Sequence, residues 1–353
     1  MGRPPPQDST STYWWAGTMT GHLRLSPVRR VVCKLRARLT GDPLVLPAVD
    51  VTPEEARAHA RPTTTGLGDM LLSWMMPMTV ARLMQWHLRV PVPRLAGGVR
   101  YEPTRPRLTA AVLSANFNWP RNVELVDTDE IPSAENWFHT AEAEGFLNAC
   151  RETSFQTIPK WIRKQLNQSD YLAAYDDVAS ELGRCPASTQ GVTNPSLPYL
   201  AVHMRRKDKG DVADEPELVR MIRTTARHFN HALVVSDDLL VREQTSRLLE
   251  AQGLTVLPQP VDPTSLDVSQ RLFRDFHCLV RAKLIISSVA QGWSAFPYAA
   301  ARMGQVPLLF TLEKSPVWRV LRAYSSRNIS SVHLGPAGAE EACRSLPVRT
   351  RIA

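Results

Sequence analysis

Apolar and polar positions alternate in a regular order through the second half of the chain. Short apolar runs are followed by longer stretches in which apolar residues recur every three or four positions, the patterns of strands and amphipathic helices. Strands are expected at residues 199–204, 232–236, 254–257, 284–287 and 306–310, and helices at residues 216–229, 239–251, 265–282 and 294–303. Such alternation predicts a parallel sheet covered by helices on both faces.

The first half of the chain has a less regular pattern. The apolar stretch from Met70 to Leu88 carries no charge before Arg82, which predicts a buried helix that Pro77 can kink. A strand is expected at residues 87–93, and helices are expected at residues 133–152 and 170–182. The segment His59–Thr65, ahead of the long helix, is a poor strand sequence.

A linker divides the chain in two. Residues 185–198 contain three prolines and a glycine, and 353 residues suit two domains of ordinary size. We expect a peripheral segment at 1–60, an N-terminal domain at 61–185, a C-terminal domain at 198–335 and a tail at 336–353. No apolar run is long enough to span a membrane, and residues 1–22 lack the apolar core of a signal peptide. The compartment stays open.

The chain has a formal net charge of +8 and five cysteines. An excess of positive charge suits nucleic acid, a membrane surface or a substrate that contains a diphosphate, and it equally suits a solvated surface rich in arginine. The cysteines are far apart, odd in number and form no Cys-x-x-Cys motif. Neither a zinc site nor a disulfide framework is therefore expected.

Cations gather directly after the first strand of the second half. Arg205, Arg206, Lys207 and Lys209 surround Asp208. Guanidinium groups pair with phosphate oxygens in a bidentate geometry, so this segment suits a diphosphate whose charge grows as a sugar–phosphate bond breaks. A basic surface turn that binds nucleic acid is the alternative interpretation.

Carboxylates follow at two later positions. Asp237 and Asp238 come directly after a strand, where they can hold a ribose or a substrate, although capping of the next helix is favoured for Asp238. Asp275 lies among apolar residues of a helix. A carboxylate there can accept both N–H groups on the Watson–Crick edge of guanine, which adenine cannot offer. An ion pair with Arg271 or Arg274 is the alternative.

A turn rich in serine and glycine ends the strand expected at residues 284–287. Residues 287–294 read Ser-Ser-Val-Ala-Gln-Gly-Trp-Ser, and Ser294 can cap the helix that follows. Backbone N–H groups and hydroxyls at such a helix start form an anion site, a feature that many α/β proteins share.

Together these motifs resemble the α1,6-fucosyltransferases, which include bacterial nodulation enzymes and are related to the protein O-fucosyltransferases. The resemblance covers about a third of the chain. It rests on His-x-Arg-Arg-x-Asp-Lys at 203–209, a strand that ends in Asp-Asp at 237–238, Asp-Phe-His-x-Leu at 275–279 and Ser-Ser at 287–288. It implies a GT-B-like α/β fold, in which two Rossmann-like domains with parallel sheets face each other across a cleft.

The resemblance also implies roles for single residues. His203 and Asp275 match positions that contact guanine, and Arg205 matches the arginine on the β-phosphate, with Arg206 as its partner at the catalytic centre. The remaining matches are Asp208 and Lys209 in the acceptor-side loop, Ser287 and Ser288 at the phosphates with Gln291 in an alternative alignment of that turn, Asp237 at the donor, and Gly66, Gly68 and Asp69 in a glycine-rich loop whose backbone faces the diphosphate.

Two features depart from the family pattern or imitate another one. The family glutamate assigned as general base falls on Ala213, so Asp211, Asp214 and Glu215 are the nearest candidates for that role. The triplet Asp127–Asp129 imitates the metal-binding motif of other glycosyltransferases. We interpret it as a polar loop, because the GT-B architecture needs no metal.

The sequence thus predicts an inverting, metal-independent glycosyltransferase with GDP-fucose as donor and no other cofactor. The acceptor would be a hydroxyl of a glycan or glycoprotein. Two alternatives stay open: a transferase for another nucleotide sugar, and a non-catalytic module that binds GDP or a glycan. A nucleic-acid-binding protein is disfavoured, because no aromatic residues are interleaved with the cations around Arg205.

Overall fold

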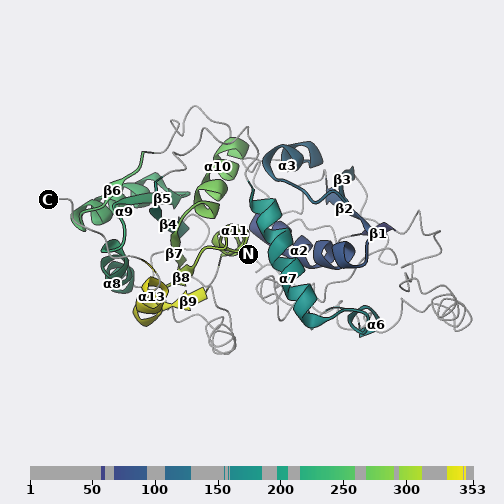
Figure 1. Cartoon of the computed structure of the whole chain (residues 1–353). Coiled ribbons are helices and arrows are strands. Elements are labelled where there is room, and N and C mark those ends of the chain that lie inside the picture. The colour runs from purple at the N-terminus through teal and green to yellow at the C-terminus, as the bar shows by residue number, and fades with distance from the viewer. Residues whose placement is uncertain are drawn as a thin grey trace, which may run out of the picture.

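The computed structural model of the protein describes residues 57–59, 67–93, 108–128, 155, 158, 160–184, 197–205, 215–258, 268–289, 294–311, 332–344 and 346. These residues form two β-sheets, each made of parallel strands, with helices packed against them (Figure 1). The expected fold class, α/β with parallel sheets, is confirmed. The helix expected at 133–152 lies outside the described residues.

The N-terminal sheet has the strand order β1-β2-β3, with every pair parallel. Its strands are β1 (Arg57–His59), β2 (His87–Pro93) and β3 (Val123–Thr128). Helix α2 (Leu67–Leu83) connects the first two strands, continues through Pro77 and is buried along its length, as its apolar sequence predicted. It ends before the expected Leu88, because Gln85 adopts a left-handed backbone conformation (φ 55°) and β2 starts at His87.

Helix α3 (Ala110–Asn116) and strand β3 were not predicted. The expectation of a polar loop at Asp127 is wrong, because this residue belongs to β3. Its Oδ1 accepts a hydrogen bond from the backbone N–H of Ala110 at 2.8 Å, and Thr109 caps the same helix by accepting from Val112 N. Asp127 is therefore occupied in holding the start of α3 against the sheet.

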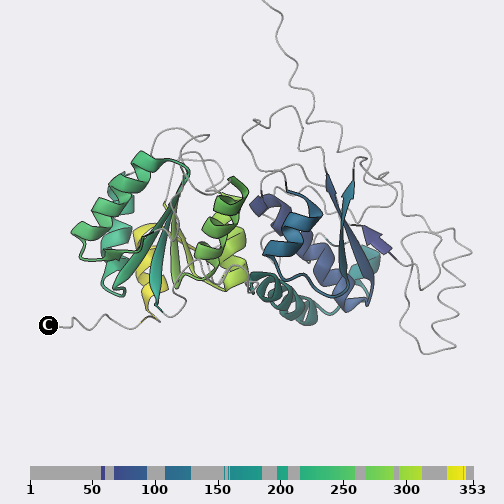
Figure 2. The same cartoon turned by 90° about the horizontal axis from the view of Figure 1, so that it is seen from above.

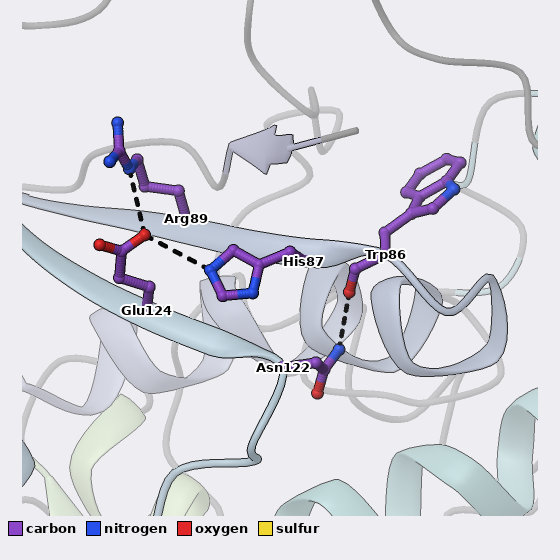
Figure 3. Close-up of polar contacts among 5 residues, drawn as sticks. All are labelled: Trp86, His87, Arg89, Asn122 and Glu124. Atoms are coloured by element: carbon purple, nitrogen blue, oxygen red, sulfur yellow. Dashed lines mark hydrogen bonds and ion pairs between the residues drawn. The ribbon is translucent and has the colours of Figure 1, made fainter. Parts of the chain in front are cut away.

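Charged side chains meet on one face of the N-terminal sheet, at the amino ends of its strands (Figure 3). Leu88 and Val90 point to the buried face, so His87 and Arg89 lie on the opposite one. Both reach Oε2 of Glu124, each at 3.4 Å. Asn122 Nδ2 donates to the carbonyl of Trp86 at 3.0 Å, which ties the turn before β3 to the start of β2.

The C-terminal sheet has six parallel strands in the order β6-β5-β4-β7-β8-β9. Their bounds are β4 (Tyr199–Arg205), β5 (His231–Ser236), β6 (Thr255–Val256), β7 (Leu284–Val289), β8 (Leu308–Phe310) and β9 (Val332–Leu334). The order is that of a Rossmann fold, in which the chain moves outward from the centre on one side and then on the other. The topological switch point lies between β4 and β7.

Helices cover both faces of this sheet (Figure 2). Helices α8 (Glu215–Ala226), α9 (Leu239–Ala251) and α13 (Gly335–Cys343) contribute to the apolar core of one face, while α10 (Val268–Val280) and α11 (Ala295–Gly304) contribute to that of the other. Strand β9 and helix α13 were not predicted. Helix α13 packs on α8, β8 and β9, so residues 336–343 belong to this layered structure although we assigned them to a tail.

Helix α11 is in contact with both halves of the sequence. It packs against α2 and against α7 (Gln168–Gly183), which follows the short helix α6 (Lys160–Arg163). A Cβ atom on Gly68 would lie 2.4 Å from the carbonyl carbon of Ala295, and one on Gly183 would lie 2.4 Å from the oxygen of Met303. Glycine is therefore required at both positions for the backbones to approach this closely. The apolar core on this side of the C-terminal sheet is continuous with that of the N-terminal helices.

No helix in the described part of the chain has the length and apolar character needed to cross a bilayer.

Candidate functional site at the switch point of the C-terminal sheet

The carboxyl ends of β4 and β7 form the centre of the candidate site. Ligands of open α/β sheets bind outside the carboxyl ends of the strands, at the point where the strand order reverses. The register pairs His203 with Ser287 and Arg205 with Val289 at this point. Two of the sequence motifs, which are far apart along the chain, therefore lie side by side where this topology predicts a ligand.

His203 is buried and neutral. Its Nδ1 lies 3.1 Å from the hydroxyl of Ser287, and its ring stacks on Phe296 with 5.8 Å between the ring centroids. Burial, assisted by the charge of Arg205, lowers its pKa to about 3. The expected contact with guanine would have to use Nε2 or the backbone, because Ser287 occupies Nδ1; among the described residues nothing hydrogen-bonds to Nε2.

Ser287 and Ser288 do not act together in this structure. Both belong to β7, which runs two residues further than predicted, and alternation along a strand sends their side chains to opposite faces. The hydroxyl of Ser287 is engaged by His203, whereas that of Ser288 is buried without a hydrogen-bond partner among the described residues. The predicted pair of phosphate-binding serines is thus divided into one engaged and one available hydroxyl.

The start of α11 lies close to the start of α2. Gly68, in the first turn of α2, contacts the backbone of Ala295 and Phe296 in the first turn of α11. Ser294 holds the N-cap position of α11 as predicted, but its side chain makes no capping hydrogen bond, and its hydroxyl is buried without a partner among the described residues. The first N–H groups of a helix have no partner within the helix, so two helix N-termini this close together favour an anion beside them.

Asp275 lies on α10 and forms an ion pair with its neighbour Arg274. The guanidinium donates to Oδ1 from Nε at 3.2 Å and from Nη2 at 3.0 Å. The ion-pair interpretation of Asp275 is therefore correct for Arg274, and it leaves Oδ2 without a hydrogen bond from any described residue. Burial raises the pKa of Asp275, although the charges of Arg274, Arg242 and Arg271 oppose that rise.

Arg242 contacts the end of strand β5, and its charge interacts with that of Asp275. It lies in the first turns of α9, and its Nη2 donates to the carbonyl of Ser236, the last residue of β5, at 3.1 Å. Burial lowers its pKa, and the charge of Asp275 opposes that effect. Arg242 was not predicted as a site residue, although it lies four residues after Asp238, in the helix that follows a strand end.

Asp238 and Asp237 have different surroundings. Oδ1 of Asp238 accepts from the N–H groups of Leu240 and Val241 at 2.9 and 3.2 Å, which confirms that Asp238 caps α9. Asp237 is exposed directly after β5.

The other predicted site residues lie largely outside the described part of the chain. Residues not described are Gly66, Arg206, Asp208, Lys209, Asp211, Asp214 and Gln291. Asp69 and Glu215 are described only as backbone, in the first turns of α2 and α8. Their roles stay predictions. Within the described residues, no group of three or more potential ligands could hold a metal ion.

Helix α10 also contacts the N-terminal half. Nε2 of the buried His277 lies 2.8 Å from the carbonyl oxygen of Asn116, at the end of α3. A carbonyl only accepts, so Nε2 carries the hydrogen, and the acceptor Nδ1 has no partner among the described residues. Phe117 packs against Phe276 with 5.5 Å between the ring centroids. The helix that carries Asp275 is thereby fixed between the C-terminal sheet and α3.

Comparison with known proteins gives similarities of fold alone. No protein-family model matches the chain, and no curated protein matches it significantly. A NodZ α-1,6-fucosyltransferase soaked with GDP-fucose has 15% identity and a TM-score of 0.41, over 71% of this chain and 93% of that chain. POFUT1 without ligand has 11% identity and a TM-score of 0.42, over 74% and 99%.

A third solved structure belongs to a different donor class. The E. coli heptosyltransferase WaaC with ADP-2-deoxy-2-fluoro heptose has 14% identity and a TM-score of 0.39, over 79% of this chain and 92% of that chain. At TM-scores near 0.4 these similarities carry no weight by themselves. A functional proposal has to rest on the residues at the switch point.

Proposed function

We propose that the protein is an inverting glycosyltransferase that transfers fucose from GDP-fucose to a hydroxyl of a glycan or glycoprotein. The observation that carries this proposal is the convergence of the sequence motifs on one sheet edge. Strand β4, which ends in Arg205, is flanked by β5 and by β7. Arg242 donates to Ser236, the last residue of β5, and its charge acts on Asp275 of α10, while Ser287 of β7 lies beside the ring of His203.

The electrostatics of the edge suit a nucleoside diphosphate. Neutral His203 adds no charge, so the positive potential comes from Arg205 at the end of β4 and from the starts of α2 and α11. The carboxylate of Asp275, on α10, would supply an acceptor for the base. An anionic polymer would instead require a continuous basic surface, and Asp275 would be unfavourable beside phosphates.

In the proposed reaction the acceptor oxygen attacks the anomeric carbon from the side opposite the diphosphate. The new carbon–oxygen bond forms as the bond to the β-phosphate oxygen breaks, and the electron pair of that bond leaves on GDP. Arg205 would stabilise the departing charge, with Arg206 as its partner. A carboxylate among Asp208, Asp211, Asp214 and Glu215 would take the acceptor proton.

Nucleotide binding is the first test. GDP should raise the melting temperature of the protein, whereas UDP and ADP should raise it much less, because only guanine offers two adjacent N–H donors to Asp275. A donor screen with GDP-fucose and other nucleotide sugars, followed by a hydrolysis assay, then identifies the sugar. Equal stabilisation by all three nucleotides would contradict guanine recognition and would favour a general diphosphate site.

Arg205→Lys tests catalysis. The substitution keeps the charge but loses the fork, so turnover should fall by about a hundredfold while GDP affinity changes far less. Arg223→Lys, an exposed arginine on α8, is the matched control and should leave turnover unchanged. If wild type binds GDP-fucose but neither transfers nor hydrolyses it, Ala213 in place of the family glutamate gives the reason. The protein would then be a binding module.

A further inference from the structure

Helix α10, which carries Asp275, is held to the N-terminal half at the end of α3. Nε2 of His277 lies 2.8 Å from the carbonyl oxygen of Asn116, the last residue of α3. The last carbonyls of a helix have no partner within the helix, so His277 satisfies one of them from another part of the chain. Burial lowers the pKa of His277 to about 4, so the ring is neutral at pH 7 and donates this hydrogen bond as one fixed tautomer.

An aromatic cluster joins the same two elements. The ring of Phe117, which follows α3, packs against three rings of α10, with centroid distances of 5.8 Å to Phe273, 5.5 Å to Phe276 and 5.4 Å to His277. These three residues lie on both sides of Asp275 in the sequence. The end of α3 therefore contacts the very turn of α10 to which Asp275 belongs.

Helix α3 is itself anchored to the N-terminal sheet. Oδ1 of Asp127, in β3, accepts from the backbone N–H of Ala110 at 2.8 Å, and Thr109 caps the start of the helix. Beyond the end of α3, the ring of Trp119 lies 6.0 Å from that of Trp74 in α2. The position of α10 is therefore set by the N-terminal half as well as by the C-terminal sheet.

The contact with α3 and the carboxylate lie on nearly opposite sides of α10. Residues two positions apart on a helix point about 200° apart, so His277 faces α3 while Asp275 faces away from it. A side-chain atom at the surface of a helix is about 5–6 Å from the axis, so a rotation of α10 by about 10° moves the carboxylate by about 1 Å. A displacement of this size weakens a directional hydrogen bond between a carboxylate and a base.

We propose that His277 is a positioning residue for base recognition: its hydrogen bond to the end of α3 holds α10 in the rotation at which Asp275 accepts from guanine. Arg274 restrains the carboxylate itself through two hydrogen bonds to Oδ1, whereas His277 restrains the helix that carries both residues. The inference rests on the proposed function, because it presupposes a guanine nucleotide at Asp275. It makes the N-terminal half, through α3, a determinant of which base the C-terminal half accepts.

Three nucleotides report the position of the carboxylate. GDP offers Asp275 two adjacent N–H donors, inosine diphosphate offers one, and ADP offers neither. In calorimetric titrations at pH 7, His277→Leu should weaken GDP binding by about ten- to a hundredfold, because hydrogen bonds to a charged group are lost. Binding of inosine diphosphate should weaken less and that of ADP should not change. His277→Gln keeps an N–H donor and should retain most of the wild-type preference.

A merely structural role predicts a different result. If His277→Leu only lowered the fraction of folded protein, the dissociation constants of all three nucleotides would rise by the same factor. Val178→Ala is the matched control, because it opens a cavity at a buried position of α7 and should lower stability without changing the base preference. Phe117→Leu should reduce the preference for GDP as His277→Leu does, and it keeps the test available if His277→Leu does not fold.

The two proposals fail in different ways. If wild type prefers GDP, and the variants at His277 and Phe117 keep that preference in full, α3 does not position Asp275, and the proposed function stands. An equal loss of affinity for all three nucleotides would also overturn the inference, since it would show a structural role alone. If wild type binds GDP, inosine diphosphate and ADP equally, guanine recognition by Asp275 is wrong, and this inference falls with it.

Discussion

Each half of the molecule has a group of titratable side chains beside its sheet, and the two groups differ in position and in burial. On the N-terminal sheet, His87, Arg89 and Glu124 meet at the amino ends of β2 and β3, and a third or more of each side chain is exposed (Figure 3). In the C-terminal half, His203 lies near the carboxyl end of β4 and Asp275 lies on α10, and both side chains are largely buried.

The position of a side chain along a parallel strand therefore indicates its role better than its residue type does. A histidine on a parallel strand is a solvent-facing partner of a carboxylate in one sheet and a neutral, buried support of a serine in the other. Ligands of parallel sheets bind at the carboxyl ends. The same side chains are therefore structural at one end of a strand and candidates for function at the other. The predictions below test that contrast.

The largest effect should come from breaking the buried ion pair. Arg274→Met leaves Asp275 buried without its closest counter-charge, which typically costs about 3–5 kcal/mol of folding free energy. Urea unfolding at neutral pH measures it. Adding Asp275→Asn to Arg274→Met should restore part of the loss, because the uncompensated charge is then gone. A loss below about 1 kcal/mol would show that the pair is as solvated as the exposed cluster.

Sequence patterns predicted the C-terminal sheet better than the N-terminal one, for a physical reason. Its strands are buried on both faces and read as continuous apolar runs. Strand β3 has only one apolar face, and Glu124 and Asp127 interrupt its sequence, so no strand was predicted there and its last residues were interpreted as a polar loop. Helix α13 was missed because its sequence Gly-Pro-Ala-Gly-Ala-Glu-Glu-Ala-Cys has no large apolar residue.

Residues of the candidate site could be predicted from the sequence only where they belong to a local sequence motif. The sequence motifs predicted roles for His203, Arg205 and Ser287, and the Rossmann strand order places β4 and β7, which carry them, side by side. The contact of Arg242 with Ser236 depends on how α9 packs on β5, and the engagement of Ser287 depends on the register of β7 with β4. Such tertiary contacts leave no local pattern in the sequence.

An intermediate effect is expected on acidification. Burial lowers the pKa of His203 to about 3 and that of His277 to about 4, whereas an unfolded histidine titrates near 6.5. The unfolded chain therefore binds more protons below that value, and stability falls as the pH drops from about 6.5 towards the folded pKa. Each histidine should cost about 1.4 kcal/mol per pH unit, or about 2–3 kcal/mol at pH 4.5.

Histidine variants isolate this contribution from that of the carboxylates. The unfolding free energy of His277→Gln should fall less steeply with pH than that of wild type between pH 6 and 4.5, and His203→Gln should behave similarly. His87→Gln, the exposed histidine of the other sheet, controls for the loss of an imidazole. Parallel curves for wild type and both buried-histidine variants would mean that the native protein accepts these protons.

The smallest effect should come from the exposed cluster. Burial acts to raise the pKa of Glu124, but the hydrogen bond from His87 and the charge of Arg89 outweigh it and lower the pKa. The resulting stabilisation is present at neutral pH and disappears as the pH falls through the lowered pKa. With 43% of the Glu124 side chain exposed, Glu124→Gln should cost less than about 1 kcal/mol of unfolding free energy.

Unfolding measurements at high salt concentration distinguish this exposed cluster from the buried ion pair of Arg274 and Asp275. The Debye length is about 3 Å at 1 M ionic strength, comparable to the 3.4 Å contacts of Glu124, so the effect of Glu124→Gln should shrink markedly in 1 M sodium chloride. The effect of Arg274→Met should persist there, because solvent ions do not reach a guanidinium with 3% of its side chain exposed. If both losses were screened equally, the carboxyl edge of the C-terminal sheet would be open to solvent, and the burial that sets the charges of His203 and Asp275 would not hold in solution.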